Sequence, residues 1–244
     1  MENNLRSTNI NDLDFETVST GNKILRSSFT WMTVAMLLTS AAAMLFAFVP
    51  GLTSILLVET ELGFKPSILA YVVMFAPIIF VMVMSFALNK LSYGALLGLF
   101  ISYALINGIS FSFIFLIYNI GSIVKVFLST TALFGVMAIA GYSTKTDLSK
   151  LGTLLRIGVI GIVIAMLINF FMHSARVDYF ISVLGVIIFT GLTAYDVQKI
   201  KNVGLMADSS AMSSKLGIMG ALTLYLDFIN LFLFLLRLFG GKRD

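Results

Sequence analysis

Long apolar runs constrain the fold of this chain more than any other feature. A helix needs roughly 20 apolar residues to cross the ~30 Å hydrocarbon core of a membrane. Seven runs meet this requirement: 29–49, 68–88, 94–117, 123–142, 154–172, 179–198 and 217–239. The sequence therefore predicts an all-α, polytopic membrane protein with seven transmembrane helices.

The composition supports this class and excludes others. Hydrophobic residues make up 59% of the chain and charged residues 11%, against about 45–50% and about 25% in soluble proteins. The net charge of +4 comes from cations that stand singly beside apolar runs. Cations at such positions orient a chain in a membrane, so we expect the lipid bilayer as a partner and no nucleic acid. The absence of cysteine excludes disulfides and thiolate chemistry.

One transmembrane domain accounts for most of the chain. Residues 1–28 are polar and have no apolar core, so we expect a polar N-terminal tail and no cleavable signal peptide. Residues 29–240 form the seven-helix domain, and residues 241–244 a short C-terminal tail. No linker or composition shift indicates a second domain.

Lys and Arg near the helix ends predict the orientation. With a cytoplasmic N-terminus, nine cations lie inside and three outside. The inner set is Lys23, Arg26, Lys90, Lys145, Lys150, Arg156, Lys199, Lys201 and Lys215; the outer set is Lys65, Lys125 and Arg176. Arg237, Lys242 and Arg243 depart from the rule, because seven crossings place them outside. The compact chain without retention signals favours a bacterial plasma (inner) membrane.

Two carboxylates interrupt the last two apolar runs. Asp196 lies near the end of the sixth run and Asp227 near the middle of the seventh. An ionised Asp at bilayer depth is costly, which makes each acid a functional-site candidate. At helical spacing Gly220, Thr223, Asp227, Asn230 and Arg237 fall on one stripe, which we expect to face protein or water.

The two acids have a functional and a structural interpretation. Within hydrogen-bonding distance they would share a proton and sense pH, and when deprotonated they would offer oxygen ligands to calcium. Alternatively, Asp196 pairs with Lys199 at the interface, and Asp227 bonds Asn230 or Tyr225. Other polar residues in the runs, Asn107, Ser110 and Asn169, are expected to form interhelical hydrogen bonds.

Three segments resemble the Bax-inhibitor-one family of membrane proteins. They are GLTAYDVQKIK (191–201), LTLYLDFINLFLFLLRLFG (222–240) and, for the loop between the fourth and fifth helices, TKTDLSKLG (144–152). The resemblance implies six helices around a central C-terminal helix and a pH-sensitive calcium leak channel. It assigns gating to a proton-sharing pair, Asp196 in AYD and Asp227 in LYLD, with calcium as the permeant or bound ion.

The resemblance also suggests further site residues. Some family members carry an arginine at the inner end of the second helix that latches onto the acid pair. This chain has Asn89 and Lys90 there, and lysine lacks the bidentate fork of arginine. Lys90 is therefore the candidate latch, and Thr223 and Asn230 are candidate pore-lining residues.

Other functions remain open at this point. Intramembrane aspartyl proteases also place acids on consecutive helices, but they need Gly-X-Gly-Asp at the second acid and a later Pro-Ala-Leu motif. Here 224–226 reads LYL and no proline follows Pro77, so we expect no enzyme and no cofactor. A proton/calcium exchanger is one alternative. The other is an interaction protein that regulates cell death or a membrane protease, with a membrane-protein partner docked on the tail or on residues 199–216.

Overall fold

The structure, a computed structural model, describes residues 10–60, 63–87, 91–203 and 210–243. Its elements are α1 (Ile10–Phe48), α2 (Pro50–Leu56), β1 (Leu57–Thr60), β2 (Gly63–Pro66), α3 (Ile68–Ala87), α4 (Tyr93–Phe111), α5 (Ile114–Ile117), α6 (Ile120–Ser143), α7 (Ser149–Met172), α8 (Ala175–Val203) and α9 (Ser210–Phe239).

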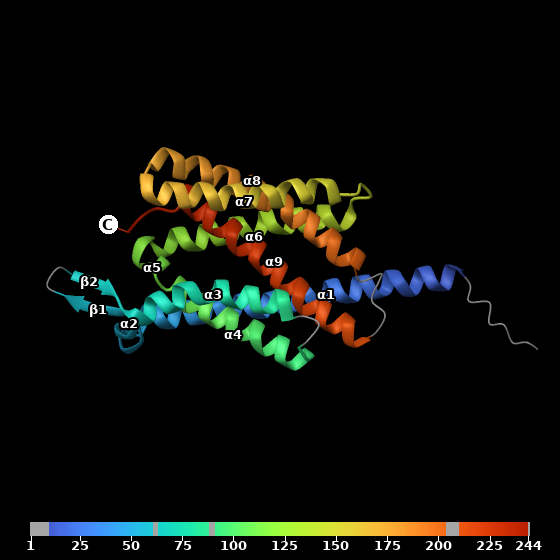
Figure 1. Cartoon of the computed structure of the whole chain (residues 1–244), viewed down its shortest axis with the longest axis horizontal. Coiled ribbons are helices and arrows are strands. Elements are labelled where there is room, and N and C mark those ends of the chain that lie inside the picture. The colour runs from blue at the N-terminus through green and yellow to red at the C-terminus, as the bar shows by residue number, and fades with distance from the viewer. Residues whose placement is uncertain (1–9, 61–62, 88–90, 204–209, 244) are drawn as a thin grey trace, which may run out of the picture.

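The helices form two layers with α9 between them (Figure 1). One layer contains α6, α7 and α8, and the other contains α1, α3 and α4. Helix α9 crosses obliquely between the layers and packs against α1, α8, α6 and α4. Helices α1, α7 and α9 begin at one end of the molecule, where α6 and α8 finish; we call it the N-terminal end. The opposite end carries the C-terminus and the β-hairpin.

Six described helices are long and apolar enough to cross a membrane: α1, the α4–α5 unit, α6, α7, α8 and α9. This finding confirms an all-α, multi-pass membrane protein. The described apolar part of α3, Ile68–Met84, is shorter than the other six, so the seventh crossing stays a prediction. Helix α9 has 72% of its span window buried, whereas no other candidate span exceeds 39%.

Helix α1 extends beyond the predicted boundary at residue 29. It begins at Ile10, so most of the segment expected to be a polar tail is helical; residues 1–9 lie outside the described part. Ile24, Ser28 and Met32 are buried at intervals of four residues, which places them on one face of the helix. The hydroxyl of Ser28 donates to the carbonyl of Gly217 in α9 at 3.0 Å. This buried stripe holds the polar segment against α9.

The structure differs from the predicted runs at two other places. The run 94–117 is broken between α4 and α5, where the hydroxyl of Ser112 donates to the carbonyl of Ile109 at 2.7 Å. A serine that bonds the preceding turn competes with the regular helical pattern. The connection 50–67, which lies outside the predicted runs, contains α2 and the antiparallel pair β1–β2, in which Leu57 lies opposite Pro66.

Candidate functional site

Close packing between α8 and α9 aligns their two acids. A Cβ atom at Gly185 of α8 would lie 2.5 Å from the ring of Phe234 in α9, so only glycine allows this approach. Phe189, one turn later, stacks on the same ring with centroids 5.8 Å apart. Because the helices run antiparallel, this contact places Asp196, two turns beyond Phe189, beside Asp227, two turns before Phe234.

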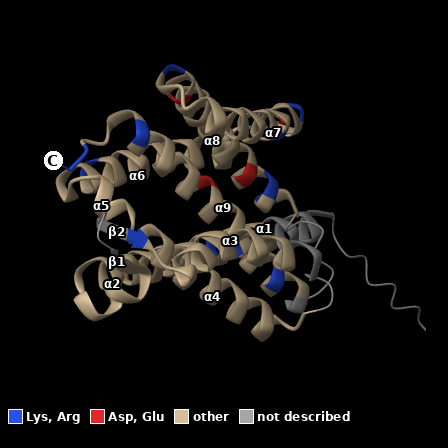
Figure 2. Ribbon diagram, turned by 60° about the vertical axis from the view of Figure 1, so that its left-hand side comes forward, with Lys and Arg blue, Asp and Glu red and all other residues tan. Residues whose placement is uncertain are grey.

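Asp196 and Asp227 form a buried pair of neighbouring acidic residues. Their side chains interact with each other, and their exposed fractions are 8% and 4%. The second oxygen of Asp227, Oδ2, is buried and has no hydrogen-bond partner among the described residues. Figure 2 shows acidic positions of α8 and α9 side by side in the interior.

Two cations act on Asp196 through space. Lys199 and Arg156 both exert a favourable Coulomb interaction on its carboxyl group. The guanidinium of Arg156 is held in place because it donates to the hydroxyl of Tyr195 at 3.1 Å and lies 5.2 Å from the centre of that ring. It also donates to the carbonyl of Gly152 at 3.2 Å. The carboxyl group of Asp196 thus has one acidic neighbour, Asp227 of α9, and two basic neighbours, Arg156 of α7 and Lys199 of α8.

The partners of the structural alternative are engaged elsewhere. Asn230 donates to the carbonyl of Leu226 at 2.8 Å. The hydroxyl of Tyr225 bonds Thr39 and Asn107. Among the residues that the structure covers, Arg237 and Asp178 form an ion pair, with 3.6 Å between their charged atoms. Lys199 and Asp196 do not form an ion pair within 4 Å.

A cavity connects Asp196 to the N-terminal end of the molecule. It has a volume of about 190 Å³ and lies between α1, α8 and α9. Asp196, Lys199, Gly220 and Thr223 contribute to its lining. Of the candidate pore residues, Thr223 therefore shares a cavity with Asp196, whereas Asn230 is absent from this lining. Lys90, the candidate latch, lies outside the described residues.

Hydrogen bonds fix α9 against the opposite layer. Thr39 of α1 donates to the carbonyl of Ala104 at 2.9 Å, so the hydroxyl of Tyr225 must donate to Thr39, at 2.8 Å. Asn107 of α4 donates to the hydroxyl groups of both Tyr225, at 3.1 Å, and Tyr103, at 3.2 Å. Tyr225 precedes Asp227 by two residues, so this network also fixes the position of Asp227 relative to α1 and α4.

Of the three expected interhelical hydrogen bonds, those of Asn107 and Ser110 are present. Asn107 bonds α9, as described above, and Ser110 of α4 donates to the carbonyl of Val73 in α3 at 2.7 Å. Asn169 of α7 accepts from the backbone N–H of Ser174, just before α8, at 3.1 Å. These contacts confirm the prediction for Asn107 and Ser110, and place Asn169 at the turn between α7 and α8.

Sequence reasoning missed two residues of the site. Arg156 was considered only as an inner cation near a helix end, although Gly152, one turn earlier, leaves room for the ring of Tyr195, whose hydroxyl accepts a hydrogen bond from Arg156. Gln198 holds the loop between α6 and α7: its side chain accepts from the N–H of Leu148 at 2.9 Å and donates to the carbonyl of Thr146 at 2.8 Å. The sequence shows that Gln198 is close to the AYD motif, because it follows Asp196 by two residues. It gives no such indication for Arg156.

The acid pair offers few ligands to a metal ion. In the described ranges, no group of three or more His, Cys, Asp or Glu lies together. Calcium takes six to eight oxygen ligands, so an ion at Asp196 and Asp227 would draw most of its ligands from water and other oxygen atoms.

The fold and this site define a multi-pass α-helical membrane protein whose last helix carries a buried acid near a buried acid of the preceding helix. The chain belongs to the Bax inhibitor-1 family: the family described as "Inhibitor of apoptosis-promoting Bax1" matches residues 21–244.

Bacterial relatives match most of the chain. It is 43% identical over 217 residues to the inner membrane protein YbhL of Escherichia coli K12, covering 88% of this chain and 90% of that protein. It is 37% identical over 216 residues to the uncharacterized protein RP147 of Rickettsia prowazekii, covering 88% of both. A Streptococcus pyogenes membrane protein, SpyM3_0260, is 40% identical over 197 residues, or 81% of this chain and 82% of that protein. With the six apolar helices, these matches identify a multi-pass protein of the bacterial inner membrane type.

Proposed function

We propose that this protein is a pH-sensitive calcium leak channel that is gated by the proton shared between Asp196 and Asp227. The observation that supports this function is the burial of two neighbouring carboxyl groups on α8 and α9, one of which lines a cavity that reaches the N-terminal end. Adding a second proton, or removing the shared one, changes the bond between α8 and α9. Loss of both protons creates two adjacent negative charges, which repel each other and attract a divalent cation.

The proposal includes a seventh crossing and a defined orientation. Helix α3 has 20 residues, which at about 1.5 Å per residue span about 30 Å, close to the hydrocarbon thickness. Its exposed side chains include Ile68, Val72 and Phe75, as suits a lipid-facing helix. With seven crossings, α9 is the central helix, and its high burial supports that place. The N-terminal end, with its cavity at Asp196, then faces the cytoplasm.

Calcium is proposed as the permeant ion and not as a resident cofactor. A pair of carboxylates attracts the ion without completing its coordination shell, and weak retention favours passage. We propose no enzymatic activity, because Leu224 and Leu226 occupy the positions where an aspartyl protease needs glycine before Asp227.

The test is calcium flux into proteoliposomes that contain the full chain, measured over a series of pH values. Asp227→Asn removes the titrating proton and keeps the side-chain volume, so we expect flux that no longer depends on pH. Asp178→Asn is the matched control: Asp178 lies on α8, half-exposed at the opposite end, and its removal leaves the pH response intact. An unchanged pH response in Asp227→Asn refutes the gating role. Calcium-driven proton movement in sealed vesicles assigns the exchanger instead.

A further inference from the structure

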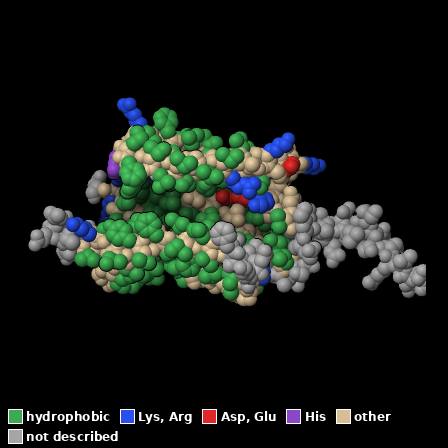
Figure 3. Space-filling model, viewed as in Figure 1, with side chains coloured by type: hydrophobic (Ala, Val, Ile, Leu, Met, Phe, Trp, Pro, Cys, Tyr) green, Lys and Arg blue, Asp and Glu red, His purple; other side chains and the backbone are tan. Residues whose placement is uncertain are grey.

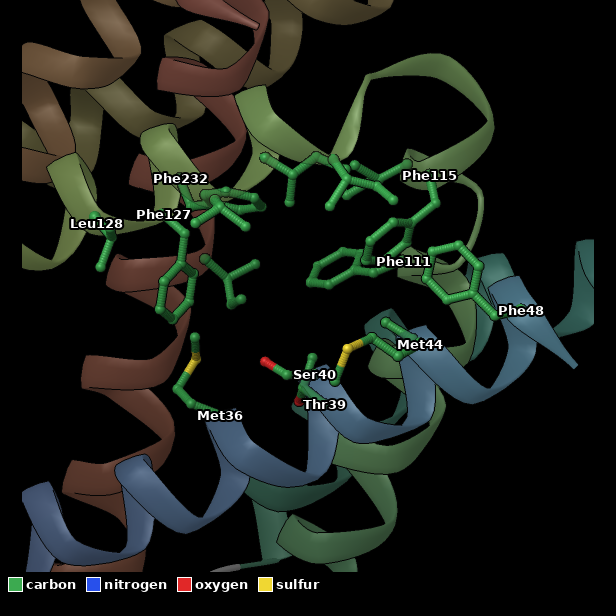
Figure 4. A pocket seen from close by; sticks show the side chains of 16 residues that line it. Met36, Thr39, Ser40, Met44, Phe48, Phe111, Phe115, Phe127, Leu128 and Phe232 are labelled. Carbon is green, nitrogen blue, oxygen red and sulfur yellow. The ribbon is translucent and has the colours of Figure 1, made fainter. Parts of the chain in front are cut away.

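An apolar cavity separates the two layers near the C-terminal end. It has a volume of about 280 Å³ and lies between α1, α4, α5, α6 and α9. Figure 4 shows Met36, Met44, Phe111, Phe127 and Phe232 around it, with Thr39 and Ser40 as the labelled residues that carry oxygen. A cavity with so few polar groups does not hold ordered water well, because water there lacks hydrogen-bond partners.

In the seven-crossing arrangement proposed above, the mouth of this cavity opens toward the hydrocarbon core of the bilayer. Met44 of α1 is 50% exposed and Leu128 of α6 is 61% exposed, and both line the cavity within candidate spans. Figure 3 shows the hollow between the layers, lined mostly by hydrophobic side chains. Lipid chains are therefore the apolar molecules that have direct access to it.

Two exposed cations of the C-terminal tail, Lys242 and Arg243, contact residues 115–118, next to the cavity. The C-terminal tail is attached to the turn between α5 and α6: Lys242 forms a β-bridge with Tyr118, and the N–H of Arg243 donates to the carbonyl of Ile117 at 2.9 Å. The guanidinium of Arg243 donates to the carbonyl of Phe115 at 3.4 Å. Phe115 itself lines the cavity and packs edge-on against Phe48, with ring centroids 5.3 Å apart.

We propose that this cavity holds an acyl chain of an anionic phospholipid whose phosphate group lies against Lys242 and Arg243. The apolar lining accepts the chain, the open mouth faces its source, and the cations complement the charge of the headgroup. The site also gives these cations a role at the outer end, where the charge rule disfavours them. The inference does not depend on calcium transport.

The test uses the full chain in vesicles of four parts phosphatidylcholine to one part phosphatidylglycerol, with bromine on the acyl chains of one lipid at a time. Bromine quenches a nearby tryptophan. The single native tryptophan is removed by Trp31→Phe, and Phe48→Trp reports from the rim. Leu167→Trp, which is 61% exposed on α7 away from the cavity, reports on ordinary lipid contact. We expect the reporter at 48 to sense phosphatidylglycerol well above its share in the vesicle, and the reporter at 167 to sense the bulk ratio.

Charge removal tests the headgroup contact. A cation near a membrane surface contributes about 1 kcal/mol to anionic lipid binding, so Lys242→Gln or Arg243→Gln should each lower the enrichment at 48 by about fivefold. Arg176→Gln, which removes an exposed cation at the same end, should leave it unchanged. Ser40→Phe fills the cavity and should also lower the enrichment.

Three results would overturn the proposal. The first is equal quenching by both brominated lipids at position 48. The second is an enrichment that survives loss of both tail cations. The third is no quenching at 48 by either lipid, which means that protein covers the cavity instead. The charge variants change exposed residues, so they test the proposal even where Ser40→Phe does not fold.

Discussion

Removal of the Tyr225 hydroxyl tests whether the network at the centre of α9 holds the two layers together. Tyr225→Phe keeps the buried ring and deletes one oxygen atom. That atom donates to Thr39 and accepts from Asn107. The substitution therefore removes one contact to α1 and one to α4 without opening a large cavity.

The expected cost follows from the remaining partners. Interhelical hydrogen bonds in membranes contribute about 0.6 kcal/mol on average and at most about 1.7 kcal/mol. After the change, Thr39 still donates to Ala104 and Asn107 still donates to Tyr103, so no donor is left wholly unpaired. Two average bonds give a loss of about 1 kcal/mol in the free energy of unfolding.

Unfolding of the purified protein by sodium dodecyl sulfate in mixed micelles measures this loss. Tyr179→Phe is the control, because Tyr179 is exposed and should cost almost nothing. A cycle with Thr39→Ala should show a coupling of about 0.6 kcal/mol with Tyr225→Phe. If Tyr225→Phe costs no more than Tyr179→Phe, or if the cycle shows no coupling, the hydrogen-bond reasoning is wrong.

Two further changes test the packing and the inner loop. Gly185→Ala brings a methyl group against the ring of Phe234, and such overpacking should cost about 1–3 kcal/mol in the same unfolding assay; Gly161→Ala, which meets nothing within 4 Å, should cost nothing, and equal effects would refute the assigned contact. The hydrogen bonds from the side chain and backbone of Ser149 lower the pKa of the Asp147 carboxyl group. Because its pKa is lower in the folded protein, Asp147 stabilises the loop above the ordinary Asp pKa and loses this effect as the pH falls through the lowered value. Ser149→Ala removes one of the two bonds, so carbon-13 NMR should show the Asp147 pKa moving part of the way up; no movement would contradict the hydroxyl contact.

Helix positions were predictable because a membrane imposes length and hydropathy on each crossing. The runs at 123–142 and 179–198 lie within α6 and α8. The break at Ser112 was not predictable, because an apolar run containing serine reads the same whether the side chain bonds within a regular helix or ends it. The extension of α1 to Ile10 was also hidden, since the stripe formed by Ile24, Ser28 and Met32 acquires its meaning only from contact with α9.

The candidate site also has features that the sequence predicts and features that it does not. The cost of burying charge selected Asp196 and Asp227 from the sequence, but their contact depends on the close approach of Gly185 and Phe234, which hydropathy does not encode. Arg156 was not predicted as a site residue because it lies on α7, and its position depends on the ring of Tyr195 in α8. No spacing in the sequence relates these two residues.

The hydrogen bonds between Gln198 and the loop between α6 and α7 bear on which helices can move relative to each other. One amide side chain at the end of α8 holds two backbone groups of that loop, and the backbone of Ala194 lies directly against Gly141 of α6. These contacts join α6, α7 and α8 to one another at the N-terminal end of the molecule. Under the proposed gating, separation of the two carboxyl groups would therefore occur by displacement of α9 relative to these three helices.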